Sequence, residues 1–422
     1  MFKTISMVGL GYIGLPTAAV FAARGVDVIG VDVSPRVVET INAGRIHIVE
    51  PELAGIVHMA VTAGKLRATL TPEPADAFIV AVPTPFAEGH QPDLSYIRSA
   101  CEKIAPVLAR GNLVILESTS PVGATEQMAA WLAELRPDLS FPQTAGERGG
   151  EAADVQVAHC PERVLPGQVV RELVENDRII GGMTQRASRM AVALYKLVVR
   201  GDCVITDART AEMCKLTENA SRDGQIAFAN ELSMICDRLE IDVWELIRLA
   251  NRHPRVNILQ PGAGVGGHCI AVDPWFIVAS APDEARLIRT ARERNDSKPH
   301  WVLEKGKAAL FGALAANPSR SLSEMTVACL GLAFKPNIDD LRESPALEIT
   351  RAFGSLGCKV LAVEPHIDTL PAAFDALPVR LVDLEAALGA DVVCVLVRHD
   401  AFAGLRAALP EGARLIDVVG LS

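Results

Sequence analysis

The sequence predicts an α/β protein in which two doubly wound parallel sheets are joined by an α-helical middle domain with a long connecting helix. A chain of 422 residues is longer than one hydrophobic core normally supports, so we expect more than one domain. Short β-branched runs alternate with helical patterns in the first and last parts of the chain, and a long helical stretch lies between them. Such alternation favours parallel sheets covered by helices on both faces.

Four short apolar runs are predicted as strands of the first sheet, whose domain we expect over residues 1–205. They are rich in β-branched residues and cover residues 5–8, 28–32, 78–82 and 113–117. A fifth run, residues 178–182, is predicted to close this domain.

The middle domain, expected over residues 206–300, opens with one long helix. Residues 206–239 contain no proline and one glycine, Gly224, and apolar residues recur there at helical spacing. Thr206 or Asp207 can cap the start of this helix, and a second helix is expected over residues 243–251. Because long helices between domains often bury one face against a second subunit, we expect a homodimer.

Strand and helix patterns alternate again in the last domain, expected over residues 301–422. Its predicted strands cover residues 326–330, 359–363, 392–397 and 414–418. The segment ADAFIVAV at residues 75–82 resembles ADVVCVLV at residues 390–397, which indicates that the two sheets are related. Buried parallel strands, however, resemble one another in any protein.

Composition excludes several classes of protein. The formal net charge of −10 argues against a nucleic-acid partner, because such proteins need a basic surface. None of the nine cysteines falls in a C-x-x-C pair, which predicts reduced thiols and no metal site. Glycines, Pro16, Arg24 and Asp27 interrupt the apolar N-terminal segment, so it is not predicted to span a membrane. We expect a cytoplasmic protein without a membrane partner.

The sequence GLGYIG follows the first predicted strand and begins the first helix. In that context the pattern G-x-G-x-x-G is typical of a site for the pyrophosphate of a dinucleotide. The first glycine permits the tight turn, the second lets the phosphates approach the backbone, and the third lets the helix pack on the strand. The candidate contacts are Gly9, Gly11, Tyr12, Ile13 and Gly14.

Asp32 ends the second predicted strand, where its carboxylate can accept hydrogen bonds from the adenosine ribose. A 2′-phosphate would be repelled there, so NAD is the expected cofactor. Arg36 could accommodate such a phosphate or be a solvated helix residue. Thr84, Thr119 and Thr125 follow the third and fourth strands and are candidates for the nicotinamide half, although such segments are often simple strand-ending turns.

The segment PGAGVGGHCIAVDP at residues 261–274 is the most informative stretch of the chain. Its four closely spaced glycines would let the backbone pass close to a ligand, and Cys269 follows where a thiol could react. The alternative is a flexible loop with an inert cysteine, which is how we interpret the other eight cysteines.

Six motifs in this order resemble the UDP-glucose/GDP-mannose dehydrogenase family over essentially the whole chain. They are GLGYIGLP, ESTSPVG, CPERVLPG, AEMCKLTEN, GVGGHCIAVDP and GLAFKPNIDDLRESP. The resemblance implies a Rossmann-like NAD domain, a helical dimerisation domain and a C-terminal Rossmann-like domain that binds a UDP-sugar. It also implies that Cys269 is the nucleophile, that Lys215 and Asn219 stabilise oxyanions, that Asp273 assists proton transfer and that Glu162 assists hydrolysis.

The chemistry of the residues agrees with these roles. Oxidation of an alcohol to a carboxylate removes two hydrides, and a thiol can trap the aldehyde as a thiohemiacetal that is oxidised to a thioester. Lys215 and Asn219 are four residues apart on the predicted helix, so they share a face, which Arg222 continues. Without Cys269, we would interpret this face as solvated.

The resemblance further implies a set of substrate contacts, in which His253 and Arg255 could belong to the partner subunit. The candidates are Arg163, Val164, Lys215, Asn219, Arg222, His253, Arg255, Gly266, Lys335 and Arg342. The resemblance is strongest to members that oxidise UDP-N-acetyl-D-mannosamine. UDP-glucose and UDP-N-acetylglucosamine remain alternatives, and so do a two-electron hydroxyacid dehydrogenase and a non-catalytic NAD or nucleotide-sugar sensor.

Overall fold

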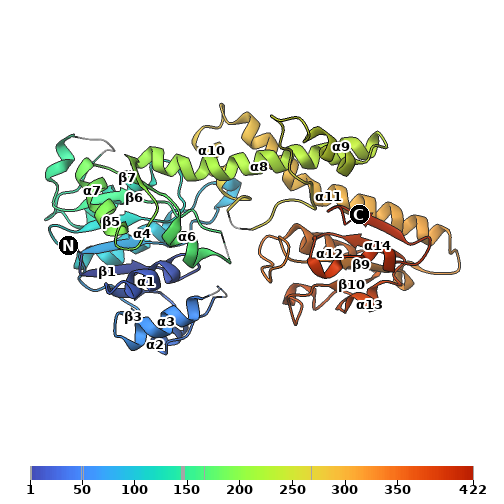
Figure 1. Ribbon diagram of the computed structural model, residues 1–422, viewed down its shortest axis with the longest axis horizontal. Coiled ribbons are helices and arrows are strands. Elements are labelled where there is room, and N and C mark those ends of the chain that lie inside the picture. The colour runs from blue at the N-terminus through green and yellow to red at the C-terminus, as the bar shows by residue number, and fades with distance from the viewer. Residues whose placement is uncertain are drawn as a thin grey trace. The chain divides into compact units, whose positions relative to one another are not determined.

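The structure is a computed structural model that describes residues 2–48, 50, 52–143, 148–165, 167–267 and 269–421. The chain divides into two compact units, Met1–Glu218 with Ala279–Ala281, and Asn219–Val278 with Pro282–Ser422. Figure 1 shows the sheet and the covering helices of each unit.

The first unit contains an eight-stranded sheet in the order β3-β2-β1-β4-β5-β6-β7-β8. Its strands are β1 (Thr4–Val8), β2 (Asp27–Val31), β3 (Leu66–Thr69), β4 (Ala77–Val80), β5 (Leu113–Leu116), β6 (Gln156–His159), β7 (Arg178–Gly182) and β8 (Cys203–Asp207). Every pair of neighbours is parallel except β6 and β7, which are antiparallel. The four predicted strands are confirmed as β1, β2, β4 and β5. Residues 178–182 form β7, and β8 lies beyond it at the edge of the sheet.

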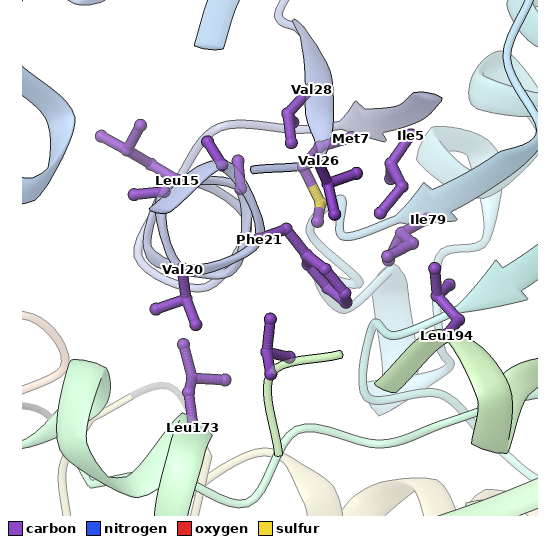
Figure 2. Close-up of a cluster of buried hydrophobic side chains, with 14 of the residues drawn as sticks. Ile5, Met7, Leu15, Val20, Phe21, Val26, Val28, Ile79, Leu173 and Leu194 are labelled. Carbon is purple, nitrogen blue, oxygen red and sulfur yellow. The ribbon is translucent and has the colours of Figure 1, made fainter. Parts of the chain in front are cut away.

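Helices cover both faces of this sheet, as the doubly wound prediction requires. Alternate strand residues separate into two apolar clusters, with Met7 in one and Val8 in the other. One cluster is closed by α1 (Gly14–Ala23), α3 (Leu53–Thr62), α6 (Val169–Glu175) and α7 (Gln185–Tyr195), and the other by α4 (Ser95–Ile104) and α5 (Ala124–Leu135). Figure 2 shows Phe21 of α1 within the first cluster, near the strand residues Met7 and Ile79.

The second unit contains a five-stranded parallel sheet in the order β11-β10-β9-β12-β13. Its strands are β9 (Thr326–Leu330), β10 (Lys359–Val363), β11 (Val379–Leu381), β12 (Val392–Val395) and β13 (Arg414–Asp417). This order repeats that of the first five strands of the other sheet. Because β4 and β12 occupy equivalent places, the similarity between residues 75–82 and 390–397 reflects related sheets.

Long helices precede and cover this second sheet. The helix α8 (Ala208–Arg238) directly follows Asp207, whose Oδ1 accepts the Thr210 N–H at 2.9 Å and so caps the start of the helix. The remaining helices are α2 (Pro35–Asn42) in the first unit and α9 (Val243–Ala250), α10 (Asp273–Ser280), α11 (Arg286–Ala315), α12 (Pro345–Ser355), α13 (Leu384–Ala387) and α14 (Leu405–Ala408).

The helix α11 is continuous through Pro299, although proline in a helix interior normally breaks the hydrogen-bonding pattern. It therefore crosses residue 300, where the sequence analysis placed a domain boundary. None of the helices in the described part of the chain combines the length and apolar character needed to cross a bilayer.

Candidate active site

The GLGYIG loop joins β1 to α1, and its three glycines meet different requirements. Gly9 has φ +93°, and a Cβ added there would lie 2.4 Å from the Ala81 carbonyl oxygen. A Cβ at Gly14 would lie 1.8 Å from the Gly9 carbonyl oxygen. At Gly11, by contrast, no atom of the described residues comes within 4 Å of an added Cβ. The second glycine thus leaves space that fits a pyrophosphate. This space lies at the start of α1, where the apolar Ile13 side chain cannot cap the helix and the backbone N–H groups suit an anion.

Asp32 lies directly after β2, with its carboxylate fixed by backbone donors. Oδ2 accepts the Leu10 N–H at 3.1 Å, and Oδ1 accepts the Ser34 N–H at 2.9 Å. Arg36 is exposed at the start of α2. No local pattern pointed to His47, which interacts electrostatically with Asp32. Burial lowers the pKa of His47, and the negative charge of Asp32 opposes that shift.

Two of the three candidate threonines lie together at the carboxyl edge of the sheet. The Thr84 hydroxyl donates to the Thr119 carbonyl at 2.6 Å, which joins the segments after β4 and β5. Thr125 is buried elsewhere, and its hydroxyl donates to Glu212 of α8 at 2.6 Å. Glu212 also accepts the Gly123 N–H at 2.6 Å, so this carboxylate fixes the start of α5.

Glu162 lies buried in the segment after β6, and Lys215 of α8 is buried in the same unit. Burial raises the pKa of Glu162 to about 7, while the positive charges of Lys215 and Arg178 lower it. Glu162 also accepts the backbone N–H of Val164. A carboxyl group with such a pKa can exchange protons near neutral pH.

The segment that carries Glu162 is fixed by carboxylates that the sequence analysis did not identify. Glu50 accepts the backbone N–H groups of Gly167 at 2.9 Å and Val169 at 2.7 Å. Arg163, a candidate substrate contact, forms an ion pair with Glu218 at 2.6 Å.

A buried triad lies beside Glu162. Glu117 Oε1 accepts from Arg178 at 3.3 Å and from the Tyr195 hydroxyl at 3.1 Å. The Arg178 guanidinium also donates to the Pro161 carbonyl at 3.4 Å, next to Glu162 in the chain. Glu117 and Arg178 therefore act on Glu162 with opposite charges, the first raising its pKa and the second lowering it.

Cys269 is exposed and lies close to two other candidate catalytic residues. Its carbonyl oxygen accepts the Asp273 N–H at 2.9 Å, where α10 begins. The buried Asp273 carboxylate accepts from Asn219 Nδ2 at 2.5 Å. The structure therefore brings Cys269, Asp273 and Asn219 together, and Lys215 precedes Asn219 by four residues on α8.

The glycines before Cys269 have a role that the sequence analysis did not anticipate. A Cβ at Gly266 would lie 2.3 Å from the Glu343 carbonyl oxygen, and one at Gly267 would lie 3.1 Å from the Phe334 ring. The Gly267 N–H also donates to the Arg342 carbonyl at 3.2 Å. These two glycines allow the loop to pack against the protein's own segment 334–345, a requirement separate from the expected approach of a ligand. His268 lies outside the described residues.

The segment 331–345 repeats the architecture of the NAD loop. Gly331 has φ +89°, and Glu364, at the end of β10, accepts the Leu332 N–H at 2.7 Å as Asp32 accepts that of Leu10. On this segment Arg342 forms an ion pair with Asp340 at 2.5 Å, and the Lys335 amine lies 5.9 Å from the centroid of the Phe334 ring.

Glu364, His366 and His399 could offer atoms to a metal ion within 4.8 Å of one another. His399 is already engaged, however, since its Nδ1 accepts the Asn337 N–H at 3.0 Å and its Nε2 bonds Glu364 at 3.0 Å. We interpret this group as a clamp on the loop that follows Lys335.

The remaining candidates are exposed. Arg222 lies on α8, and His253 and Arg255 lie in a loop after α9 that Asn251 closes through two hydrogen bonds with Ile258.

The first sheet, its glycine loop and Asp32 define an NAD-dependent dehydrogenase. The comparisons with known proteins are more specific, because the chain belongs to the UDP-glucose/GDP-mannose dehydrogenase family. Residues 3–199 match its NAD binding domain, residues 209–297 its central domain and residues 328–421 its UDP binding domain.

Two curated relatives align over the whole chain. An NDP-N-acetyl-D-galactosaminuronic acid dehydrogenase of Ralstonia nicotianae is 63% identical over 100% of this chain and 96% of its own length. A UDP-N-acetyl-D-mannosamine dehydrogenase of Salmonella typhi is 61% identical over 100% and 99%. Among solved structures, the UDP-D-ManNAc dehydrogenase of Pyrococcus horikoshii has a TM-score of 0.85 at 39% identity and covers 99% of this chain and 96% of its own.

Proposed function

We propose that this protein oxidises the C6 alcohol of UDP-N-acetyl-D-mannosamine to the carboxylate, with two NAD per turnover. The observation that carries the proposal is the exposed Cys269, bonded through its carbonyl to Asp273, which in turn accepts from Asn219. A dehydrogenase that removes one hydride has no need of a thiol in this setting. The names of the Salmonella and Pyrococcus relatives support the acetamido sugar.

The thiol serves the second oxidation. NAD, when held by the GLGYIG loop and Asp32, would supply the hydride acceptor for each oxidation. Loss of a hydride from C6 and of the hydroxyl proton gives the aldehyde in the first oxidation. The Cys269 thiolate adds to the aldehyde carbon, and a proton joins the oxygen, which forms a thiohemiacetal. Removal of the second hydride and of the hydroxyl proton gives a thioester. Water then adds to the thioester carbonyl, and the C–S bond breaks to release the carboxylate and the thiol.

The polar residues stabilise charge and move protons. The Lys215 ammonium and the Asn219 amide, one turn apart on α8, stabilise the oxyanions that form at C6. Asp273 orients the Asn219 amide. Glu162, with its pKa raised to about 7 by burial, accepts a proton from the water that cleaves the thioester.

Substrate recognition is assigned to polar residues of several elements. The nucleotide would be held from the segment that contains Lys335 and Arg342 and from the backbone at Gly266. The sugar would be contacted by Arg163, Val164 and Arg222, and by His253 and Arg255 of a second subunit. His253 and Arg255 are exposed on a loop that Asn251 holds by a hydrogen bond to Ile258. This position supports contact between these two residues and the substrate of a neighbouring subunit.

We also propose domains over residues 1–205, 206–300 and 301–422. The last of these boundaries falls inside α11.

We further propose that the protein is a homodimer that forms through the middle domain. Large apolar side chains are exposed on or next to α8 and α9, namely Met213, Phe228, Ile235, Leu239 and Leu249. Light scattering that gives the mass of one 45.0 kDa chain would contradict the dimer. A cytoplasmic location is supported by the nine free cysteines, each of which the structure describes.

A second candidate substrate is UDP-N-acetyl-D-galactosamine. It is favoured by the 63% identity to the Ralstonia enzyme, whose name specifies the galactosaminuronic acid. The chemistry at C6 would be the same, so only the residues that contact the sugar ring would distinguish the two.

The test is a panel of UDP-N-acetylmannosamine, UDP-N-acetylgalactosamine, UDP-N-acetylglucosamine and UDP-glucose compared by kcat/KM from NADH absorbance. We expect the highest value for the mannosamine substrate and two NADH per sugar consumed. A higher value for the galactosamine substrate would favour the second candidate. One NADH per sugar would contradict the covalent route, and no NADH with any of the four sugars would favour a sensor.

A further inference from the structure

A buried polar cluster lies between α8 and α11, within the second unit. We define it by four residues that are each 0% exposed, Asp223 and Asn230 of α8 and Arg292 and Asn295 of α11. Charged residues are rarely buried to this extent unless they are paired. None of the four has a role in the chemistry proposed above.

The members of the cluster bond to one another in a chain. Asp223 Oδ1 accepts from the Arg292 guanidinium and from Asn295 Nδ2, the latter at 2.7 Å. Asn295 Oδ1 accepts from Asn230 Nδ2 at 2.9 Å. Each side chain therefore restricts the orientation of the next.

Two members also bond to the backbone of the loop that carries Cys269. Asn230 Oδ1 accepts the Gly262 N–H at 2.9 Å, near the start of the loop. Arg292 Nη1 donates to the carbonyl of Ile270 at 3.4 Å, directly after Cys269. The cluster thus contacts both ends of the glycine-rich segment 262–270, whose described residues form neither helix nor strand.

The packing of α8 against α11 does not by itself require this buried polar cluster. Burying an arginine and a carboxylate requires the loss of their hydration, and an apolar pair of similar volume is often equally stable. The same helices are already joined by the ion pairs Glu231–Arg294 at 2.8 Å and Asp237–Lys305 at 2.5 Å, both nearer the surface. The distinguishing property of the buried cluster is its contact with the loop.

We infer that Asp223, Asn230, Arg292 and Asn295 are positioning residues that hold the Cys269 loop, so that the thiol captures the aldehyde before it escapes. Asp223 and Asn295 hold the arginine and asparagine side chains, and Arg292 and Asn230 hold the loop backbone. This inference rests on the proposed function insofar as Cys269 is taken as the nucleophile.

The main test variant is the double substitution Asp223→Leu with Arg292→Met, which leaves no unpaired buried charge. The matched control is Asp237→Leu with Lys305→Met, which removes a more exposed ion pair between the same two helices. Asn230→Ala is a second test variant that removes the Gly262 contact without changing any charge. Circular dichroism and Tm establish that each variant is folded.

The first measurement needs no sugar. Hydrogen–deuterium exchange of the peptide that contains residues 262–273 should be faster in both test variants than in wild type and unchanged in the control. The second measurement is the yield of NADH per sugar with semicarbazide present to trap aldehyde. In the test variants the yield should fall from two toward one and kcat should fall by roughly 100-fold, since small misplacements of a reacting group have effects of that order, with little change in KM.

Two results would overturn the inference. One is loop exchange in both test variants equal to that of wild type. The other is faster loop exchange with an NADH yield that stays at two and an unchanged kcat, because the cluster would then hold the loop without positioning the thiol. Wild-type protein that forms no NADH would instead refute the proposed function, and the exchange comparison would still decide whether the cluster holds the loop.

Discussion

The Asn219 amide donates to the Asp273 carboxylate at 2.5 Å, and the Asp273 N–H donates to the carbonyl of Cys269 at 2.9 Å. Through these two bonds, one aspartate connects the long helix α8 to the segment that carries the thiol. The side chain of Asp273 is buried, so the bond to Asn219 is protected from competing water. The orientation of the amide and the position of the thiol are therefore set by the same residue.

Replacement of the thiol tests the covalent route directly. Cys269→Ser should lower kcat by several orders of magnitude, because a serine hydroxyl captures the aldehyde less readily than a thiolate does and would form an ester in place of the thioester. The Kd for NAD should not change, since the GLGYIG loop belongs to the first compact unit and Cys269 to the second. Tryptophan fluorescence titration with NAD and NADH assays give the two quantities. Near-normal turnover in this variant would exclude Cys269 as the nucleophile.

The glycines of the NAD loop should respond differently to the same substitution. Gly14→Ala places a Cβ against the Gly9 carbonyl and should destabilise the protein by at least roughly 2 kcal/mol. Gly11→Ala meets no described atom within 4 Å, so the fold should be retained. NAD binding should nevertheless weaken on the order of tenfold, or about 1.4 kcal/mol, because the methyl group occupies the space left for phosphate.

Urea unfolding and NAD titration of the two alanine variants distinguish these effects. The prediction for Gly11 is contradicted if its alanine variant binds NAD as tightly as wild type. The prediction for Gly14 is contradicted if its alanine variant unfolds at the same urea concentration as wild type.

Glu162 should make stability depend on pH. Burial raises its pKa from 4.5 to about 7, so between these values the folded protein binds more protons than the unfolded chain. Stability from this group is therefore greatest below pH 4.5 and falls as pH rises to 7, by roughly 3 kcal/mol. Glu162→Gln removes the ionisation, so it should raise Tm relative to wild type above pH 7 and much less near pH 5.

The same substitution should remove an activity transition. If Glu162 must be deprotonated to accept a proton from water, kcat of wild type rises with pH through about 7. Glu162→Gln should have a low and flatter profile, with NAD binding retained as the control. A wild-type profile without a transition in this range, or an unchanged profile in the variant, would contradict the role of Glu162.

The sequence predicted those parts of the molecule in which local pattern and final structure agree. Apolar β-branched runs located β1, β2, β4 and β5, and glycine spacing located the NAD loop. It did not locate β3, β6 or β8, because LRAT, QVAH and CVITD are short and partly polar. It also did not identify α11 as one helix, because Pro299 lies within it.

The supporting residues of the site were missed for a different reason. Asp223 lies on a predicted helix, where a charged residue is normally interpreted as solvated surface. Arg292 lies on α11, for which no helix was predicted. Only the packing of α8 against α11 shows that both are 0% exposed. Glu50 and Glu117 are similar cases, since each acts on a segment more than 40 positions away in the sequence. Such contacts leave no local pattern in a single sequence.

The glycines before Cys269 give the last prediction, which separates packing from ligand approach. Gly266→Ala places a Cβ 2.3 Å from the Glu343 carbonyl, so the loop must shift. Because Cys269 follows three residues later, kcat should fall by roughly 100-fold. Gly262→Ala is the matched control, since no described atom lies within 4 Å of its Cβ and its φ is not in the left-handed region. Steady-state assays of both variants with NAD and the preferred sugar give kcat for each. An equal loss of kcat in the two variants would show that the glycines are required for loop flexibility and not for close packing on residues 334–345.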